Sequence, residues 1–181
     1  MSESGYIRLH EGSEASKRDP PEARLVQLSE RELVRWGRRI GETVATPAIL
    51  ALSGELGAGK SVFARAVGQG AGVEGPMPSP TFTLLQRYAA RRRRRVVHLD
   101  LYRLDSPDEL WELGWSQLGE DDEIVLIEWA ERAGGLLSGD HWRIELTVPA
   151  GLTHLRDVDV SRVGSPPDLP GFPLTLTEQG R

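Results

Sequence analysis

One octapeptide constrains the fold of this chain more than any other feature. Residues 54–61 read GELGAGKS and fit the pattern G-x-x-x-x-G-K-[ST], a loop that wraps the phosphates of a nucleoside triphosphate. Before it, residues 47–52 form a short apolar run, as expected for a buried parallel strand. After it, Phe63 and Val67 lie one helical turn apart, and glycines close the segment. The loop is therefore predicted to join a strand to a helix, the setting that it requires.

Each residue type in the loop suits a phosphate site. Glycines let the backbone approach phosphate closely, and successive N–H groups at a helix start bind anions. Lys60 is predicted to reach the β and γ phosphates, and the Ser61 hydroxyl to coordinate Mg²⁺. The chain has 22 lysines and arginines, yet only Lys17 and Lys60 are lysines, so a lysine stands where phosphate chemistry favours one. The predicted ligands are ATP or GTP with Mg²⁺, bound by Glu55, Leu56, Gly57, Ala58, Gly59, Lys60, Ser61 and Val62; an ordinary glycine-rich turn is the alternative.

The length of 181 residues predicts a single domain with an addition at each end. Residues 1–23 are polar and charged, and residues 163–181 are rich in proline. We expect both segments to be weakly ordered, and residues 24–162 to form the P-loop domain.

Composition excludes several classes of protein. There is no cysteine, so neither disulfides nor thiolate metal sites can form. No apolar run approaches the roughly 18 residues that span a membrane, and no secretory signal pattern is present, so we expect a cytosolic protein without a membrane partner. The net charge of −5 argues against a general nucleic-acid binder. A local exception is the run Arg91, Arg92, Arg93, Arg94 and Arg95.

Strand and helix patterns alternate along the chain. Ser29 and Glu32 form a capping box that opens a helix with the apolar stripe Leu33, Trp36, Ile40 and Val44. A second capping box, Ser106 to Glu109, predicts a short helix that stops at Gly114. Strands are predicted over residues 81–88, 96–103, 124–127, 141–148 and 155–160, the last two as an antiparallel pair or as edge strands. This order predicts an α/β three-layer P-loop NTPase fold, with a parallel sheet core and added antiparallel strands.

Two acidic residues are candidates to complete the metal site. Glu128 ends an apolar strand, and ligands of open α/β sheets lie beyond the carboxyl ends of the strands. The alternative for Glu128 is an ion pair with Arg132. Asp100 lies in a strand-like segment, where burying an unpaired carboxylate is costly, so it faces either the magnesium and attacking water or an arginine such as Arg103.

Other polar and aromatic residues leave more than one interpretation open. The loop SPTF at residues 79–82 offers hydroxyls, including that of Thr81, as a γ-phosphate sensor or forms an ordinary turn. His98 is more typical of a structural histidine than of a catalytic base. Trp111, Trp115 and Trp129 are more typical of packing than of a nucleotide platform. The arginine run is interpreted as a solvated loop, with contact to tRNA or a partner protein as the alternative.

Five strings occur in the order that is typical of one family. They are GELGAGKS, SPTFTL, HLDLYRL, SPDEL continuing to ELG, and IVLIEWAER, and they span about residues 25–160. In these strings the chain resembles the TsaE family of bacterial ATPases. The resemblance implies an ATPase required for threonylcarbamoyladenosine in tRNAs that read codons starting with A, acting with TsaD-like and TsaB-like proteins. Contact with tRNA would then be indirect or through the arginine run.

The resemblance also implies roles for individual residues. Ser61, usually threonine in the family, and Glu128 match the magnesium ligands. Asp100 matches an aspartate implicated in activity, and Thr81 matches a switch element; with Lys60 and Glu128 they are the implied catalytic residues. Ser29, Glu30 and Arg156 match nucleotide-contacting positions. Leu33 replaces a common threonine, which is a departure at the adenine side.

Two rival functions follow from the same loop. A small-molecule kinase would need an arginine-rich lid, a role that the arginine run could imitate. A GTP-dependent switch is disfavoured because the chain contains no asparagine, so the guanine-reading motif N-K-x-D is absent. We therefore expect ATP rather than GTP.

Overall fold

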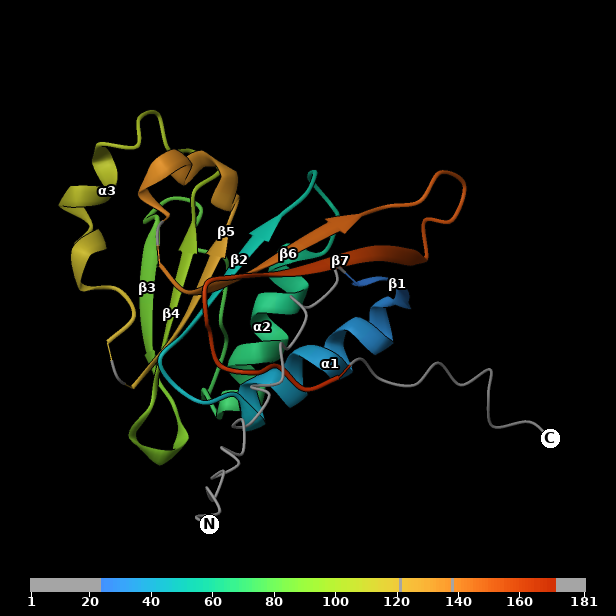
Figure 1. Ribbon diagram of the computed structural model, residues 1–181, viewed down its shortest axis with the longest axis horizontal. Helices are drawn as coiled ribbons and strands as arrows, with labels where there is room; N and C mark the ends of the chain where they lie inside the picture. Colours follow the sequence, from blue (N-terminus) through green and yellow to red (C-terminus); the bar gives the residue numbers. More distant parts are fainter. Residues whose placement is uncertain (1–23, 121, 138, 172–181) are drawn as a thin grey trace, which may run out of the picture.

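The computed structural model describes residues 24–120, 122–137 and 139–171, and within them one sheet carries helices on both faces (Figure 1). Its strands are β1 (Arg24–Ser29), β2 (Ala48–Ser53), β3 (Leu85–Ala89), β4 (Arg95–Asp100), β5 (Glu123–Glu128), β6 (His141–Thr147) and β7 (Leu155–Val163). The helices are α1 (Glu30–Thr43), α2 (Lys60–Ala71) and α3 (Glu109–Glu112), with 3-10 segments η1 (Arg91–Arg93), η2 (Trp115–Gln117) and η3 (Ala130–Leu136). The expectation for residues 1–23 lies outside the described residues.

The sheet has a parallel centre and antiparallel margins. Its strand order is β1-β7-β6-β2-β5-β4-β3. Strand β2 lies parallel between β5 and β6, and β5 is parallel to β4. Antiparallel pairs join β3 to β4, β6 to β7 and β7 to β1. The predicted parallel core with added antiparallel strands is confirmed.

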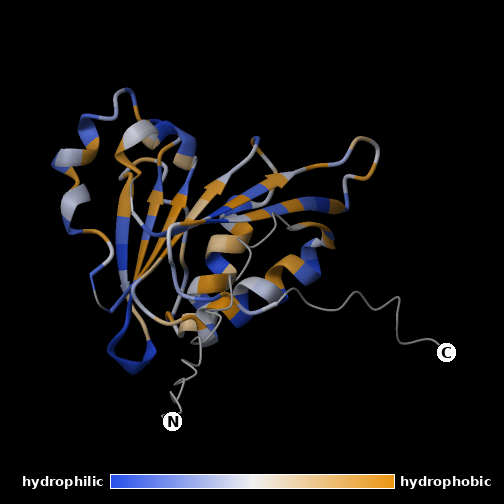
Figure 2. Cartoon of the chain, viewed as in Figure 1, coloured by the Kyte–Doolittle hydropathy of each residue, from blue (hydrophilic) through white to orange (hydrophobic). Residues whose placement is uncertain are grey.

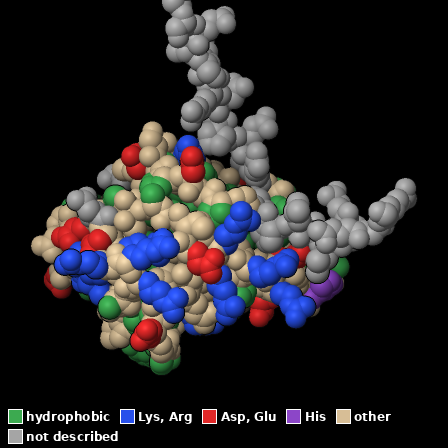
Figure 3. Space-filling view, turned by 90° about the horizontal axis from the view of Figure 1, so that it is seen from below, with side chains coloured by type: hydrophobic (Ala, Val, Ile, Leu, Met, Phe, Trp, Pro, Cys, Tyr) green, Lys and Arg blue, Asp and Glu red, His purple; other side chains and the backbone are tan. Residues whose placement is uncertain are grey.

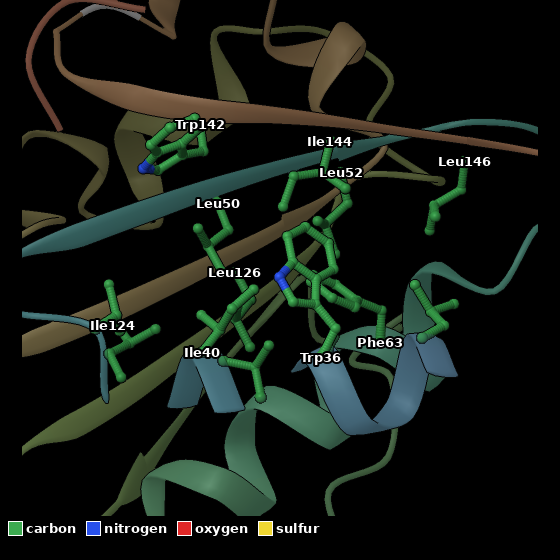
Figure 4. Close-up of a cluster of buried hydrophobic side chains, with 14 of the residues drawn as sticks. Trp36, Ile40, Leu50, Leu52, Phe63, Ile124, Leu126, Trp142, Ile144 and Leu146 are labelled. Atoms are coloured by element: carbon green, nitrogen blue, oxygen red, sulfur yellow. The ribbon is translucent and has the colours of Figure 1, made fainter. Parts of the chain in front are cut away.

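Two hydrophobic clusters lie on opposite faces of the sheet. Successive residues of a strand point to opposite faces, so Leu50 and Leu126 pack with Trp36 of α1 and Phe63 of α2 (Figure 4). Val125 instead joins a second cluster, which packs under α3 and η3. Burial on both faces explains why the central strands are hydrophobic along their length (Figure 2). The fold therefore has the three layers that the sequence predicts.

Helix α1 begins and packs as its sequence predicts. The Ser29 side chain accepts a hydrogen bond from the Glu32 backbone N, and the Glu32 carboxylate accepts one from the Ser29 N at 2.9 Å. Glycines let α1 approach α2 closely: a Cβ at Gly41 would lie 2.0 Å from the Val67 carbonyl oxygen. A Cβ at Gly70 would lie 1.9 Å from a carbonyl oxygen of α1. Contact between the two backbones holds α2, and the loop before it, against the sheet.

Two predicted strands are shorter than expected because both adjoin turns. The segment predicted over residues 81–88 forms a strand only from Leu85, since the Leu84 N donates to the Pro80 carbonyl at 2.7 Å. The segment predicted over residues 96–103 ends as a strand at Asp100. The Asp100 carboxylate accepts from the Tyr102 N at 3.0 Å and so turns the chain there.

The second capping box forms only in part. Glu109 Oε1 accepts from the Ser106 N at 2.8 Å, as a capping box requires. The Ser106 hydroxyl accepts from the Asp108 N rather than from the N of Glu109, and α3 begins only at Glu109. The helix still stops before Gly114, as predicted, and Gly114 has a positive φ of 76°.

The proline-rich segment packs on the domain as far as residue 171. The Trp142 Nε1 donates to the Pro167 carbonyl at 2.8 Å, and the Trp36 Nε1 donates to the Pro170 carbonyl at 2.9 Å. Pro166 is buried, and Leu169 packs against the core cluster of α1 and α2. Residues 164–171 are therefore part of the packed domain rather than of the expected tail, because buried indole N–H groups need acceptors and find them there. The expectation for residues 172–181 lies outside the described residues.

Within the described ranges, every helix is too short or too polar to traverse a bilayer.

Candidate functional site

The predicted phosphate-binding loop joins β2 to α2, as expected from the sequence. Gly54, Gly57 and Gly59 have positive φ angles of 128°, 85° and 108°, which glycine adopts without strain. The Phe63 N donates to the Gly59 carbonyl at 2.9 Å, so α2 begins directly after the loop. The positive end of α2 therefore faces the space above the loop, where an anion is stabilised.

Lys60 is almost buried at the start of α2, with 4% of its surface exposed. Its Nζ donates to the carbonyl oxygens of Gly54 at 2.5 Å and Glu55 at 2.9 Å, and it lies 3.7 Å from the centre of the Trp129 ring. Burial lowers the pKa of Lys60, and the charges of Glu128 and other acids oppose this shift. Among the described residues Lys60 has no ion pair, so a phosphate would supply its missing counter-ion.

Parallel pairing brings the two candidate carboxylates together beside the loop. Asp100 ends β4, Glu128 ends β5, and the two are paired in register. Glu128 is also paired with Leu52 near the end of β2, directly before the loop. The carboxylates are 4% and 2% exposed, and both lie at the carboxyl end of the parallel strands. This is the edge at which open α/β sheets bind ligands.

Hydroxyl groups of the phosphate loop and of residues 79–81 bind the two carboxylates. The Ser61 Oγ donates to Glu128 Oε2 at 2.7 Å. The Ser79 Oγ donates to Asp100 Oδ2 at 2.5 Å, and the Thr81 Oγ1 donates to the same oxygen at 2.7 Å. These hydroxyls therefore satisfy the hydrogen-bonding capacity of the buried carboxylates. A metal ion or a water molecule could take the place of the hydroxyls.

Neither of the alternative ion pairs is present. The Arg132 guanidinium donates to the Leu104 carbonyl at 3.1 Å rather than to Glu128. The Arg103 guanidinium lies 4.3 Å from the centre of the Phe82 ring rather than on Asp100. Both carboxylates consequently bind hydroxyl groups of the site and not neighbouring arginines.

His98 holds Glu128 from below the site. Its Nε2 lies 2.8 Å from Glu128 Oε1, and the ring is fully buried on β4. The His98 Nδ1 is buried without a hydrogen-bond partner among the described residues. That arrangement fits a ring whose Nε2–H donates to the carboxylate. Such a bond orients Glu128, as partners of metal-ligating carboxylates do.

A cleft of about 300 Å³ opens over these groups. Its walls include most of the predicted loop positions, namely Leu56, Gly57, Gly59, Lys60, Ser61 and Val62. The opposite wall consists of Ser79, Thr81, Asp100, Tyr102, Glu128 and Trp129. Of the other predicted loop residues, Ala58 is fully buried and Glu55 contributes its carbonyl to Lys60.

The three other residues predicted to contact the nucleotide, Ser29, Glu30 and Arg156, do not line this cleft. Ser29 caps α1, and Glu30 is exposed at the start of the same helix. The Arg156 Nε donates to the Ala58 carbonyl at 2.8 Å, so this side chain supports the loop from outside. Leu33 lies beside Gly59, which places the start of α1 next to the loop. Contact of these residues with a nucleotide stays a prediction.

The donor set suits a hard cation that also binds phosphate. Ser61 and Glu128 offer oxygen atoms, the ligands that Mg²⁺ prefers. The described residues contain no group of three or more acidic, histidine or cysteine side chains that could hold a metal alone. Magnesium commonly binds through few protein oxygens and completes its shell with phosphate and water, so the residues present fit it.

Three site residues, His98, Tyr102 and Trp129, were not assigned from sequence, and Ser79 was predicted only as one of the hydroxyls of the loop at residues 79–82. Ser79 and His98 occur in the strings SPTF and HLDLYR, so their position beside Thr81 and Asp100 was an available signal. Trp129 has a positive φ of 57°, and its ring lies against the Lys60 ammonium group. No local sequence pattern predicts this backbone conformation for a tryptophan.

Comparisons with known proteins agree on one family. A family model described as "Threonylcarbamoyl adenosine biosynthesis protein TsaE" matches residues 28–154. A tRNA threonylcarbamoyladenosine biosynthesis protein TsaE from Treponema pallidum is 33% identical over 134 residues, which cover 74% of this chain and 93% of the relative. The protein of that name from Mycobacterium tuberculosis H37Rv is 40% identical over 117 residues, 61% of this chain and 70% of its own.

One solved structure has the same fold. The crystal structure of Bacillus subtilis YdiB superimposes with a TM-score of 0.59 at 21% identity, covering 78% of this chain and 88% of that one.

Proposed function

The chain belongs to the TsaE family of threonylcarbamoyladenosine biosynthesis proteins, and from this premise we propose that it is a Mg²⁺-dependent ATPase that assists this tRNA modification. The observation that carries the proposal is the hydrogen bond of 2.7 Å between Ser61 of the loop and Glu128. It joins a phosphate-binding loop to a buried acid at the place where a nucleotide-bound Mg²⁺ needs both.

The described side chains divide the work of hydrolysis. Lys60 neutralises charge on the β and γ phosphates once it leaves the loop carbonyls. Ser61 and Glu128 would hold Mg²⁺, which when bound neutralises charge on the phosphate oxygens. Asp100 and Thr81 would orient the attacking water, since a carboxylate and a hydroxyl 2.7 Å apart can share its hydrogen bonds.

ATP is proposed over GTP because the means to read guanine is missing. The chain has no asparagine, so it cannot form the N-K-x-D motif. Its only D-x-x-G sequence begins at Asp168, on the segment that packs by Trp36 and Trp142.

The arginine run does not support the kinase alternative. It lies between β3 and β4, at the start of β4, whereas the site lies at the end of that strand. A strand rises about 3.3 Å per residue, so the five steps from Arg95 to Asp100 separate the run from the cleft by roughly 16 Å. Arg95 is moreover occupied by ion pairs with Glu120 and Asp122. A phosphate lid from these residues is therefore not proposed.

Partners similar to TsaD and TsaB are proposed to dock at the open cleft. Three large apolar side chains are exposed around its loops: Leu56 at 78%, Phe82 at 82% and Tyr102 at 41%. Exposed apolar groups beside a catalytic cleft are typical of protein contact sites. Hydrolysis would then drive or reset the enzyme that transfers the threonylcarbamoyl group.

The site assignment is tested by two variants of the full chain. We expect Lys60→Ala to lose tight ATP binding, because it removes the cation from the phosphates. Glu128→Ala should keep much of the binding and lose Mg²⁺-dependent phosphate release. Calorimetry with ATP and GTP, followed by a phosphate assay with the partner proteins present, measures both effects. Equal hydrolysis by all three proteins, or tighter binding of GTP than ATP, would overturn the proposal.

The pathway assignment needs a cellular measurement. Depletion of the protein in its native cell should lower threonylcarbamoyladenosine among the tRNA nucleosides. Wild-type protein should restore the level, whereas Lys60→Ala should not. An unchanged nucleoside level, in a cell without a redundant activity, would reject this assignment.

A further inference from the structure

Arginines cover the solvent face of α1. Arg31, Arg35, Arg38 and Arg39 recur at helical spacing opposite the buried stripe, and all four are exposed. None of them forms an ion pair with a described residue. Arg38 donates to the neutral Gln69 side chain of α2 at 2.9 Å, which leaves its charge uncompensated. Lys and Arg side chains gather on the face that includes this helix (Figure 3), although the chain has a net charge of −5.

The β3–β4 hairpin extends this face. Arg94 donates to the Gly41 carbonyl at 2.8 Å, at the C-terminal end of α1, where helix carbonyls favour cations. The Arg91 side chain packs against Gly72, which caps the end of α2. These two anchors hold the hairpin tip beside the helices. Arg92 and Arg93 at the tip are exposed, with a φ of 61° each, and form no ion pair with a described residue.

We propose that this arginine face, defined as Arg31, Arg35, Arg38, Arg39, Arg92 and Arg93, binds the phosphate backbone of a folded RNA. Such contacts neutralise phosphates, release counterions and need no base-specific geometry. The choice of RNA rests on the proposed function, because the family acts in a tRNA modification. The charge of the face does not depend on that function.

Apolar exposure separates a phosphate backbone from other anionic partners. The large exposed hydrophobic side chains of the described residues are Leu25, Leu56, Phe82, Tyr102, Trp111 and Leu152. None of them lies on α1, on α2 or at the hairpin tip. Binding of splayed single strands uses aromatic platforms, and stable attachment to a lipid surface uses apolar side chains. A face with several arginines and no large exposed apolar side chain among the described residues therefore favours a double-helical stem, which is recognised by its shape and backbone.

The test is a salt titration of full-length protein with fluorescently labelled, unmodified tRNA, followed by anisotropy. Arg39→Gln and Arg92→Asn each remove one charge, and asparagine tolerates the positive φ at residue 92. The control is Arg143→Gln: Arg143 is exposed on β6, between Trp142 and Ile144, which point towards α1 and α2, so it lies on the opposite face of the sheet. We expect each variant on the arginine face to lower the slope of log K against log salt by about 0.9, and the control to keep the wild-type slope.

Other results would overturn the inference. They are no tRNA binding at low salt, equal loss in the Arg143→Gln control, or binding to oligouridine as tight as to tRNA. Tighter binding to acidic lipid vesicles or to polyglutamate would assign the face to a membrane or a protein instead. Lys60→Ala separates the two proposals, because it should lose ATP binding while tRNA binding persists. If tRNA binding depends on the arginine face but wild-type protein with its partners hydrolyses no ATP, only the proposed function fails.

Discussion

At the scale of single residues, the site contains charged side chains that are almost completely buried. Lys60 and Asp100 are 4% exposed and Glu128 is 2% exposed, although buried charges cost free energy unless they are paired or hydrogen-bonded. Loop carbonyls satisfy Lys60, and hydroxyls satisfy the two acids. These partners are weaker than a phosphate or a metal. Binding of a nucleotide with Mg²⁺ should therefore increase the stability of the folded protein.

The Thr81 hydroxyl provides a residue-scale prediction. Thr81→Val removes the bond of 2.7 Å to Asp100 without changing the side-chain shape much. We expect ATP binding to persist and turnover to fall by about tenfold or more, because the water would lose one of its two orienting groups. Single-turnover phosphate release and calorimetry separate the two effects. Thr81→Ser keeps the hydroxyl and should retain most of the rate. Equal rates for Thr81→Val and Thr81→Ser would show that the Thr81 hydroxyl does not take part in hydrolysis.

At the scale of elements, backbone contact between α1 and α2 determines where the site and the arginine face lie. Gly41 lies over the Val67 carbonyl and Gly70 lies under the Arg38 carbonyl, so neither position has room for a Cβ. The same close contact lets Arg38 reach Gln69 across the helices. Hydrophobic periodicity predicts both helices but says nothing of the distance between them.

Gly41→Ala tests this packing. The added Cβ would lie 2.0 Å from the Val67 carbonyl oxygen, which the helices must separate to relieve. We expect the free energy of unfolding to fall by about 1–3 kcal/mol, the usual effect of overpacking a core. Gly135→Ala is the matched control, since its Cβ would meet nothing within 4 Å. Urea denaturation of both variants gives the comparison, and equal midpoints would show that the helices can separate at little cost.

At the scale of the whole molecule, the C-terminal part of the described chain closes the core of α1 and the sheet. Two indole N–H groups, on α1 and β6, both donate to carbonyls of residues 164–171. Pro166 is buried and Leu169 packs against the same cluster. This segment therefore joins elements that are more than 100 residues apart in sequence, since Trp36 and Pro170 are separated by 134.

Truncation tests that role. A chain that ends at Val163 loses both indole acceptors and the cover over the core, so its melting temperature should fall clearly below that of a chain that ends at Gly171. Differential scanning calorimetry measures both. Equal melting temperatures would mean that residues 164–171 do not contribute to the packed domain.

Local signals predicted the parts of the fold that local chemistry determines. The capping box of Ser29 and Glu32 formed as written because both partners lie within one helical turn. The capping box of Ser106 formed only in part, and the strand predicted from residue 81 began at Leu85. In the second case Asp100, nineteen residues away, binds the Thr81 hydroxyl and keeps the segment in a turn.

By itself, the sequence determined the loop between β2 and α2, the start of α1, and the alternation of strand and helix, because each depends on residues adjacent in the chain. Only the tertiary structure decided which groups Asp100, Glu128, His98 and Trp129 contact. Their roles depend on the parallel register of β4 and β5 and on the turn after β5, which pair residues 28 or more positions apart. The tertiary structure also distinguishes the residues of the arginine run. Arg94 and Arg95 bind neighbouring groups of the domain, whereas Arg92 and Arg93 are exposed and form no ion pair with a described residue. Tertiary packing alone determines which of these side chains lie next to a partner.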